Sequence, residues 1–203
     1  MGLAEECVAK LGDDPEKNDS VFRKICELFE YLPLGATIND KILCIHSGIG
    51  ENVKTLEDIR QIKKPYKVSN NNPVIDLLYS QPVESVDGEA YTGQNYTSEF
   101  RTKTFDGDKV SEFLKLNKID LIIRSHDLTE SGFERLYDSK VISIYSATNY
   151  CGFMNNNGGI IFVKKNLEVQ PKILPYEETS STWIKSDKIS KEYPPSPKKI
   201  LNK

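Results

Sequence analysis

Apolar residues along the chain fall into two patterns, short continuous runs and segments in which they recur every three or four positions. Continuous runs are typical of strands buried on both faces, and the three-to-four spacing is typical of helices. Strands are therefore expected at 41–46, 119–126, 141–146, 159–164 and 168–174, and helices at 19–31, 74–79 and 108–116. This mixture of helices and short buried strands predicts an α/β layered fold.

Polar and turn-forming segments mark the boundaries between these elements. The helix over 19–31 has Asp19 or Ser20 as its N-cap and ends before Pro33, because the residue preceding a proline avoids helical dihedral angles. The polar segment 88–97 is expected to form a loop. The last stretch, 176–203, is rich in Ser, Lys and Pro and has few apolar residues, which predicts a mobile C-terminal tail.

The composition of the 203 residues, 38% hydrophobic and 28% charged, indicates a globular domain. The 27 basic and 30 acidic residues are spread along the chain, so no basic surface of the kind that binds nucleic acid is expected. No apolar run is long enough to span a bilayer, and no membrane partner is expected. The cysteines (Cys7, Cys26, Cys44 and Cys151) are scattered, which favours a reducing compartment, the cytoplasm or the nucleus.

The chain has two histidines, and each stands at the end of a predicted buried strand. His46 closes the run 41–46, and His126 closes the run 119–126. Ligand sites of open α/β sheets gather at the carboxyl ends of strands, and imidazole is a common metal ligand. The alternative is that each histidine is an ordinary packed residue. Because a structural zinc site needs four ligands and the chain has no cysteine cluster, any further ligands would be carboxylates or amides.

Four segments around these histidines resemble, in order and spacing, motifs of the PPP family of serine/threonine protein phosphatases. They are LPLGA (32–36), KILCIHSG (41–48), IRSH (123–126) and YSATNYCG (145–152), similar to the family's LP segment, HGG strand end, R-[AS]-H motif and SAPNYCG signature. Asn156 and Gly158 match the N-x-G that follows, and the resemblance covers about residues 3–175. The GIG after His46 and the Thr148 that replaces proline are most similar to the kelch-repeat-containing branch.

The resemblance implies an α/β fold, a partial metallophosphoesterase-type β-sandwich flanked by helices. Residues 1–175 would form the C-terminal portion of a serine/threonine phosphatase catalytic domain, and residues 176–203 the mobile tail. In this family the motifs GDxHG, GDxVDRG and GNHE lie upstream, and none of them occurs in the 203 residues. The chain is therefore expected to begin just past them and to represent the C-terminal half of the fold.

The same resemblance implies roles for individual residues. His46 and His126 correspond to ligands of the second metal of a binuclear centre holding two divalent ions, Mn, Fe or Zn. Tyr150 would line the substrate cleft, with a half-buried packing tyrosine as the alternative. Arg101 is the nearest candidate for the phosphate-binding arginine, with an exposed loop arginine as the alternative. Arg124 is expected to be a structural residue behind His126 rather than a phosphate ligand.

The implied activity is hydrolysis of phosphoserine and phosphothreonine in protein substrates, with regulatory subunits or fused upstream domains as further partners. Two neutral imidazoles cannot offset the charge of two divalent ions, so without the upstream aspartates metal binding is expected to be weak or absent, and hydrolysis low. Ser47 replaces a glycine of HGG, and Gln81 replaces the aspartate of a W-S-D-P motif. These replacements motivate an alternative, a non-catalytic binding or regulatory module. The exposed edges of an incomplete sheet also predict self-association.

Overall fold

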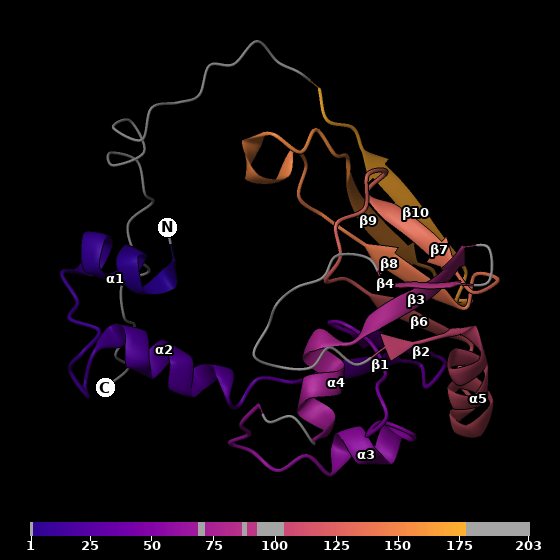
Figure 1. The fold of residues 1–203 in the computed structure, drawn as a ribbon, viewed down its shortest axis with the longest axis horizontal. Helices are drawn as coiled ribbons and strands as arrows, with labels where there is room; N and C mark the ends of the chain where they lie inside the picture. The colour runs from indigo at the N-terminus through magenta and orange to yellow at the C-terminus, as the bar shows by residue number, and fades with distance from the viewer. Residues whose placement is uncertain (1, 69–71, 87–88, 93–103, 178–203) are drawn as a thin grey trace, which may run out of the picture.

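The computed structural model describes residues 2–68, 72–86, 89–92 and 104–177, and Figure 1 shows the arrangement of its elements. In chain order these are α1 (Leu3–Leu11), α2 (Val21–Phe29), β1 (Gly35–Ile38), β2 (Ile42–Ile45), α3 (Leu56–Arg60), α4 (Pro73–Tyr79), β3 (Gln81–Val86), β4 (Glu89–Thr92), β5 (Thr104–Phe105), α5 (Gly107–Asn117), β6 (Leu121–Arg124), β7 (Phe133–Leu136), β8 (Val141–Ile144), the 3-10 helix η1 (Tyr150–Gly152), β9 (Gly158–Val163) and β10 (Val169–Leu174).

A five-stranded sheet in the order β1-β2-β6-β8-β7 forms the centre of the described chain. Its three inner strands are parallel, with Ile42 of β2 opposite Leu121 of β6 and Ile122 of β6 opposite Val141 of β8. The outer strands β1 and β7 run antiparallel to their neighbours. Because the inner strands are parallel and next to one another, the residues that follow β2 and β6 emerge at the same edge of the sheet.

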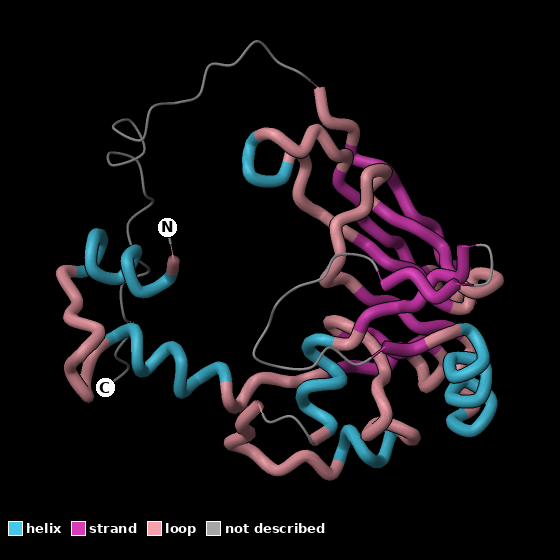
Figure 2. The backbone as a smooth tube through the Cα atoms, viewed as in Figure 1, coloured by secondary structure: helices cyan, strands magenta, loops and turns pink. Residues whose placement is uncertain are grey.

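Each face of this sheet packs against a different layer. On one face, Leu43 and Ile122 join a buried cluster with Leu77 of α4 and Phe113 of α5. On the other face, residues including Ile42 pack against the two-stranded sheet of β9 and β10. Side chains of a strand alternate between its faces, so neighbouring apolar residues of one strand contribute to both clusters. The strand layers are visible together in Figure 2. The predicted α/β fold, a β-sandwich flanked by helices, is confirmed.

Helices α1 and α2 lie side by side at one end of the molecule, apart from the strands (Figure 1). The predicted helix over 19–31 corresponds to α2, and Ser20 is its N-cap, because its side chain accepts a hydrogen bond of 3.2 Å from the backbone N–H of Arg23. The carboxylate of Asp13 accepts hydrogen bonds from the N–H groups of the first two residues of the helix, Val21 and Phe22, at 3.0 and 2.9 Å. These caps satisfy donors that an isolated helix leaves unpaired.

The prediction that 88–97 is a loop is wrong for its first part. Residues Glu89–Thr92 form β4, which pairs antiparallel with β3. The sequence of this segment, EAYT, has neither an apolar run nor a strict alternation of apolar and polar residues, so its pattern does not indicate a strand. Residues 93–97 and 178–203 lie outside the described residues, and the predicted tail is therefore untested. Among the described residues no helix has the length and apolar character needed to cross a membrane.

The short helix α3 begins at a capping box whose carboxylate makes stability depend on pH. Asp58 Oδ2 accepts hydrogen bonds from the N–H groups of Thr55 and Lys54, at 2.7 and 2.9 Å, and these bonds lower the pKa of Asp58. Since the folded pKa lies below the unfolded one, this stabilisation is present above about pH 4 and is lost as the pH falls through the folded pKa.

We therefore expect Asp58→Ala to lower the free energy of unfolding by about 0.3–1 kcal/mol at pH 7 and by less near pH 2.5. Urea unfolding at the two pH values measures this difference. Glu57→Ala is a matched control in the same helical turn, because the Glu57 carboxylate makes exposed contacts, an ion pair with Arg60 at 3.7 Å and a hydrogen bond from Gln61 Nε2 at 3.3 Å, and caps no backbone N–H in the described residues. A cost for Asp58→Ala that is the same at both pH values would contradict the assignment.

Candidate metal centre

The central sheet brings the two histidines together. His46 directly follows β2, and His126 follows β6 after one intervening residue, at the same edge of two adjacent parallel strands. The N–H of Ser125 donates to the carbonyl of His46 at 2.9 Å, which continues the strand pairing into the loops that carry the rings. The sequence predicted that each histidine ends a strand, and the pairing of β2 with β6 makes the two ends neighbours.

The two imidazole rings face each other through nitrogen atoms. Nε2 of His46 lies 3.3 Å from Nδ1 of His126, and the rings meet edge to face with centroids 5.2 Å apart. Two nitrogens bound to one metal at about 2.0–2.1 Å, with an angle between 90° and 110°, are separated by about 2.9–3.4 Å. The observed separation falls in this range, so the pair fits two ligand positions of a single ion.

The surroundings of both rings favour the neutral imidazole that a metal requires. Desolvation by the protein atoms around His46 is the main cause that lowers its pKa, although part of the ring is exposed, and the charge of Arg124 lowers it further. Desolvation is also the main cause that lowers the pKa of His126. The carboxylate of Asp127 acts in the opposite direction on both rings but does not outweigh the other effects.

The backbone at His126 adopts an uncommon conformation. Its φ of 72° lies in the left-handed region, which residues other than glycine rarely enter. Such a conformation costs free energy and persists only where the surrounding contacts hold it, and it is concentrated at functional sites. The direction of the His126 ring therefore depends on the contacts of the loop 125–129.

The loop after His46 is packed too tightly to move freely. Ser47 is fully buried, its N–H donates to the carbonyl of Leu77 at 2.9 Å, and its hydroxyl donates to the carbonyl of Ser80. A side chain at position 48 would overlap the ring of Phe105, which requires glycine there. The serine that replaces a motif glycine is thus accommodated with a hydrogen-bond partner, and it does not displace His46.

Tyr150 lies on a loop organised by a buried asparagine. Asn156 is fully buried, its Oδ1 accepts from the N–H of Tyr150 at 2.8 Å, and its Nδ2 donates to the carbonyl of Ala147 at 2.7 Å. The Tyr150 ring packs edge to face on Tyr145 and is 47% exposed. Over the described ranges, no hydrogen bond or ring contact joins Tyr150 to His46 or His126. Both readings of Tyr150, substrate contact and packing residue, stay open.

The other candidate ligands and contacts are not brought to this pair. Arg101, the candidate phosphate-binding residue, lies outside the described residues. Across residues 2–68, 72–86, 89–92 and 104–177 there is no group of three or more His, Cys, Asp or Glu side chains that could hold a metal ion. The described part of the chain therefore supplies two nitrogen ligands of a site, not a complete coordination sphere.

Arg124 and Asp127 form a charged pair beside the histidines that the sequence analysis did not predict. Arg124 is 1% exposed and forms an ion pair of 2.7 Å with Asp127, directly beside the histidine pair. The motif around His126 places Arg124 nearby but does not show where its guanidinium points. A buried charge needs a partner of opposite charge. Asp127, three residues after Arg124, was the nearby acidic residue from which this ion pair could have been predicted.

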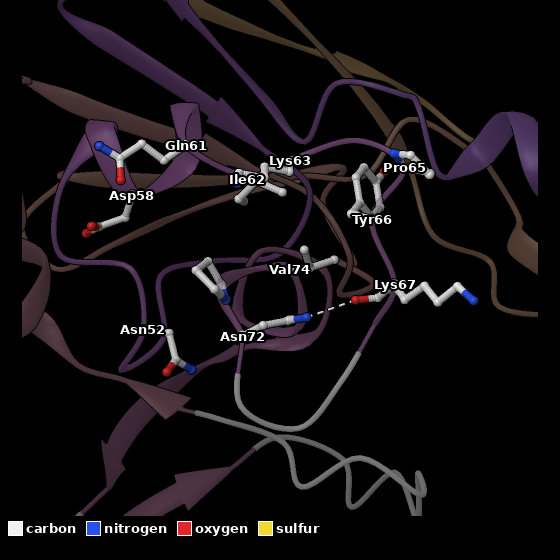
Figure 3. Close-up of a pocket in the computed structure, with 11 residues that line it drawn as sticks. Asn52, Asp58, Gln61, Ile62, Lys63, Pro65, Tyr66, Lys67, Asn72 and Val74 are labelled. Carbon is white, nitrogen blue, oxygen red and sulfur yellow. Dashed lines mark hydrogen bonds between the residues drawn. The ribbon is translucent and has the colours of Figure 1, made fainter.

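A separate cavity of about 460 Å³ lies between the connection from α3 to α4 and the first turn of α4 (Figure 3). Its lining mixes amides, ammonium groups and a tyrosine ring, contributed by residues such as Asn52, Lys63 and Tyr66, and neither histidine lines it. Asn72 closes one side, because its Nδ2 donates to the carbonyl of Lys67 at 2.8 Å while its Oδ1 caps α4. The cavity is therefore formed by α4 and the loops beside it, and it is separate from the histidine pair.

The fold and the histidine pair define an α/β sandwich with a candidate metal centre at the carboxyl edge of its sheet. A family model described as calcineurin-like phosphoesterase matches residues 4–130. The chain is 37% identical over 177 residues to serine/threonine-protein phosphatase BSL2 of Arabidopsis thaliana, covering 86% of this chain and 17% of that protein. It is 36% identical over 169 residues to the serine/threonine-protein phosphatase 4 catalytic subunit of Candida glabrata, covering 82% of this chain and 50% of that protein.

Among solved structures, a protein serine/threonine phosphatase from Saccharomyces cerevisiae, described as similar to human phosphatase PP5, matches with a TM-score of 0.70. The sequences are 26% identical, and the match covers 88% of this chain and 56% of that chain. The chain therefore belongs to the calcineurin-like phosphoesterase family, in its branch of PPP-type serine/threonine protein phosphatases. It spans half the length of the phosphatase 4 subunit and a smaller part of BSL2.

Proposed function

We propose that this chain supplies the His46–His126 half of a metal site in a protein serine/threonine phosphatase, whose substrates are proteins carrying phosphoserine or phosphothreonine. The observation that carries the proposal is the 3.3 Å separation of two facing imidazole nitrogens at the edge of two parallel strands. Family membership supports the reaction class. Imidazole nitrogen suits Mn, Fe and Zn, the candidate metals.

The roles of the chain's own residues follow from this placement. His46 and His126 would hold one divalent ion, and bound divalent ions lower the pKa of water and neutralise phosphate charge. Tyr150 would contact substrate from the loop after β8, and Arg101 would bind phosphate. Because the described residues hold no group of three or more His, Cys, Asp or Glu side chains that could bind a metal ion, hydrolysis requires ligands beyond the pair. We therefore propose that the 203 residues alone are inactive.

The cellular setting is part of the same proposal. Scattered free cysteines favour the cytoplasm or nucleus. Regulatory subunits or fused upstream domains are proposed partners, and the GIG and SATNYCG sequences favour the kelch-repeat-containing branch. Self-association is also proposed, through the exposed edges of an incomplete sheet. Apolar side chains at the α1–α2 end, such as Leu11 and Leu28, are 61% and 57% exposed and add to the apolar surface available for it.

The test is a phosphatase assay on a phosphoserine peptide with added Mn²⁺. We expect no turnover by the 203-residue chain, and turnover by a version extended at its N-terminus with a segment carrying GDxHG, GDxVDRG and GNHE. His126→Ala in the extended version should abolish the activity. Turnover by the 203-residue chain that is lost on His126→Ala would overturn the claim that it is inactive alone.

The same assay separates the second candidate, a non-catalytic binding or regulatory module. That reading is favoured by the buried Gln81, which stands where the family motif has a carboxylate. It predicts that the extended version stays inactive while it still binds a phosphoprotein in a pull-down. Restoring the carboxylate by Gln81→Asp in the extended version would then raise turnover if this residue alone accounts for the loss.

A further inference from the structure

A single buried guanidinium connects the two loops that carry the histidines. Arg124, at the end of β6, donates from Nε to the carbonyl of Ser47, the residue after His46. Its Nη1 lies 2.7 Å from the carboxylate of Asp127, the residue after His126. The same Nη1 donates to the hydroxyl of Ser143 on β8 at 2.7 Å. One side chain therefore contacts both histidine loops and a third strand.

The geometry of Arg124 suits it to this connection. A guanidinium is planar and carries its donors in a fixed arrangement, so partners bound to different nitrogens are held at a set separation. Arg124 is 1% exposed and lies opposite Ser143 in the pairing of β6 with β8. Burial strengthens its charge-assisted hydrogen bonds because water does not compete for the donors.

Arg124 contacts residues that lie next to each histidine in the chain, Ser47 after His46 and Asp127 after His126. His126 has a φ of 72°, a conformation that needs support from outside the residue, and Asp127 follows it directly. Ser47 is fixed on its other side by the carbonyl of Leu77, so the Arg124 bond joins a rigid loop to a strained one.

We propose that Arg124 and Asp127 are positioning residues that hold His46 and His126 at the spacing of two metal ligands. This inference rests on the proposed function of the pair, and it adds what sets the spacing. The guanidinium donates a hydrogen bond to the loop after His46, and its ion pair with Asp127 fixes the loop at His126 relative to that first loop. Outer partners of metal ligands commonly contribute about 10–100-fold to metal affinity.

The test compares variants of the full 203-residue chain by two readouts. The first is a cross-peak in nuclear Overhauser spectra between the carbon-bound ring protons of the two histidines, recorded without metal. Since the chain has two histidines, the ring signals are readily assigned. The second is the Mn²⁺ concentration that broadens these signals, which reports even weak binding.

Asp127→Ala is expected to remove the ring–ring cross-peak and to raise the required Mn²⁺ concentration by about 10-fold or more. Asp127→Asn keeps an acceptor oxygen and should restore the cross-peak. Ser143→Ala, which removes an Arg124 partner on β8, should weaken the cross-peak and provides a second test if Asp127→Ala does not fold. Asp120→Asn is the matched control, because Asp120 forms an exposed pair of 3.6 Å with Lys41 beside the opposite end of β6.

The outcomes separate this proposal from the proposed function. An unchanged cross-peak and unchanged Mn²⁺ response in folded Asp127→Ala and Ser143→Ala would overturn the positioning role. If Mn²⁺ broadens neither ring in the unaltered chain, the metal proposal fails for this chain, while the metal-free cross-peak still decides whether Arg124 and Asp127 set the ring spacing. Loss of thermal stability alone, with the cross-peak retained, would reduce Arg124 and Asp127 to a purely structural role and also overturn the proposal.

Discussion

Replacing His126 by alanine is expected to lower the affinity of the chain for a divalent metal by more than about 100-fold. Losing an outer partner of a metal ligand already costs about 10–100-fold, and the ligand itself contributes more. Nε2 of His46 and Nδ1 of His126 are 3.3 Å apart, so the loss of either ring leaves one nitrogen where two had faced the same point. The measurement is the Mn²⁺ concentration that broadens the remaining His46 ring signals in nuclear magnetic resonance.

The reciprocal variant is the control for this prediction. His46→Ala should raise the Mn²⁺ concentration that broadens the His126 ring signals by a similar factor, because the two nitrogens share one ion. If each remaining ring still responds at the original Mn²⁺ concentration, the histidines act independently and the shared site is wrong. Circular dichroism of both variants shows whether the fold is retained.

The second large effect is on stability. Leu77, on α4, is fully buried among residues of both the sheet and α5, and Leu77→Ala would leave a cavity that this packing cannot fill. We expect the free energy of unfolding to fall by about 2–5 kcal/mol. Urea unfolding followed by circular dichroism measures it.

Leu116→Ala is the matched control, since the same atoms are removed from a leucine of α5 that is 60% exposed. Its expected effect is within about 0.5 kcal/mol. Similar costs for the two variants would show that α4 does not belong to the core. Because the carbonyl of Leu77 accepts the N–H of Ser47, a displaced α4 would also move the loop after His46.

The strands at the centre of the sheet could be predicted because their signal is local. β2 and β6 are buried on both faces, so almost every residue in each run is apolar, as the continuous pattern indicates. Helix α5 could be predicted for a related reason, since Val110, Phe113 and Leu114 mark its one buried face. In both cases the side chains themselves report their environment.

Two outer strands, β4 and β7, could not be predicted because their side chains do not show an apolar pattern. β7 has the sequence FERL, in which only Leu136 is buried, and its strand conformation depends on pairing with β8. β4 likewise depends on pairing with β3. A four-residue segment with two or more polar side chains has no periodicity that distinguishes a strand from a loop.

By itself, the sequence determined the two buried strands, the histidine that ends each, and the motifs that resemble the phosphatase family. It could not determine that β2 and β6 are adjacent, that their histidine nitrogens face each other, or that Arg124 reaches both loops. A side-chain pattern records burial along one segment, whereas these contacts join residues about 80 positions apart, and only the packed sheet brings them together. The histidine pair is thus encoded locally as two strand ends and becomes a candidate metal centre through tertiary structure.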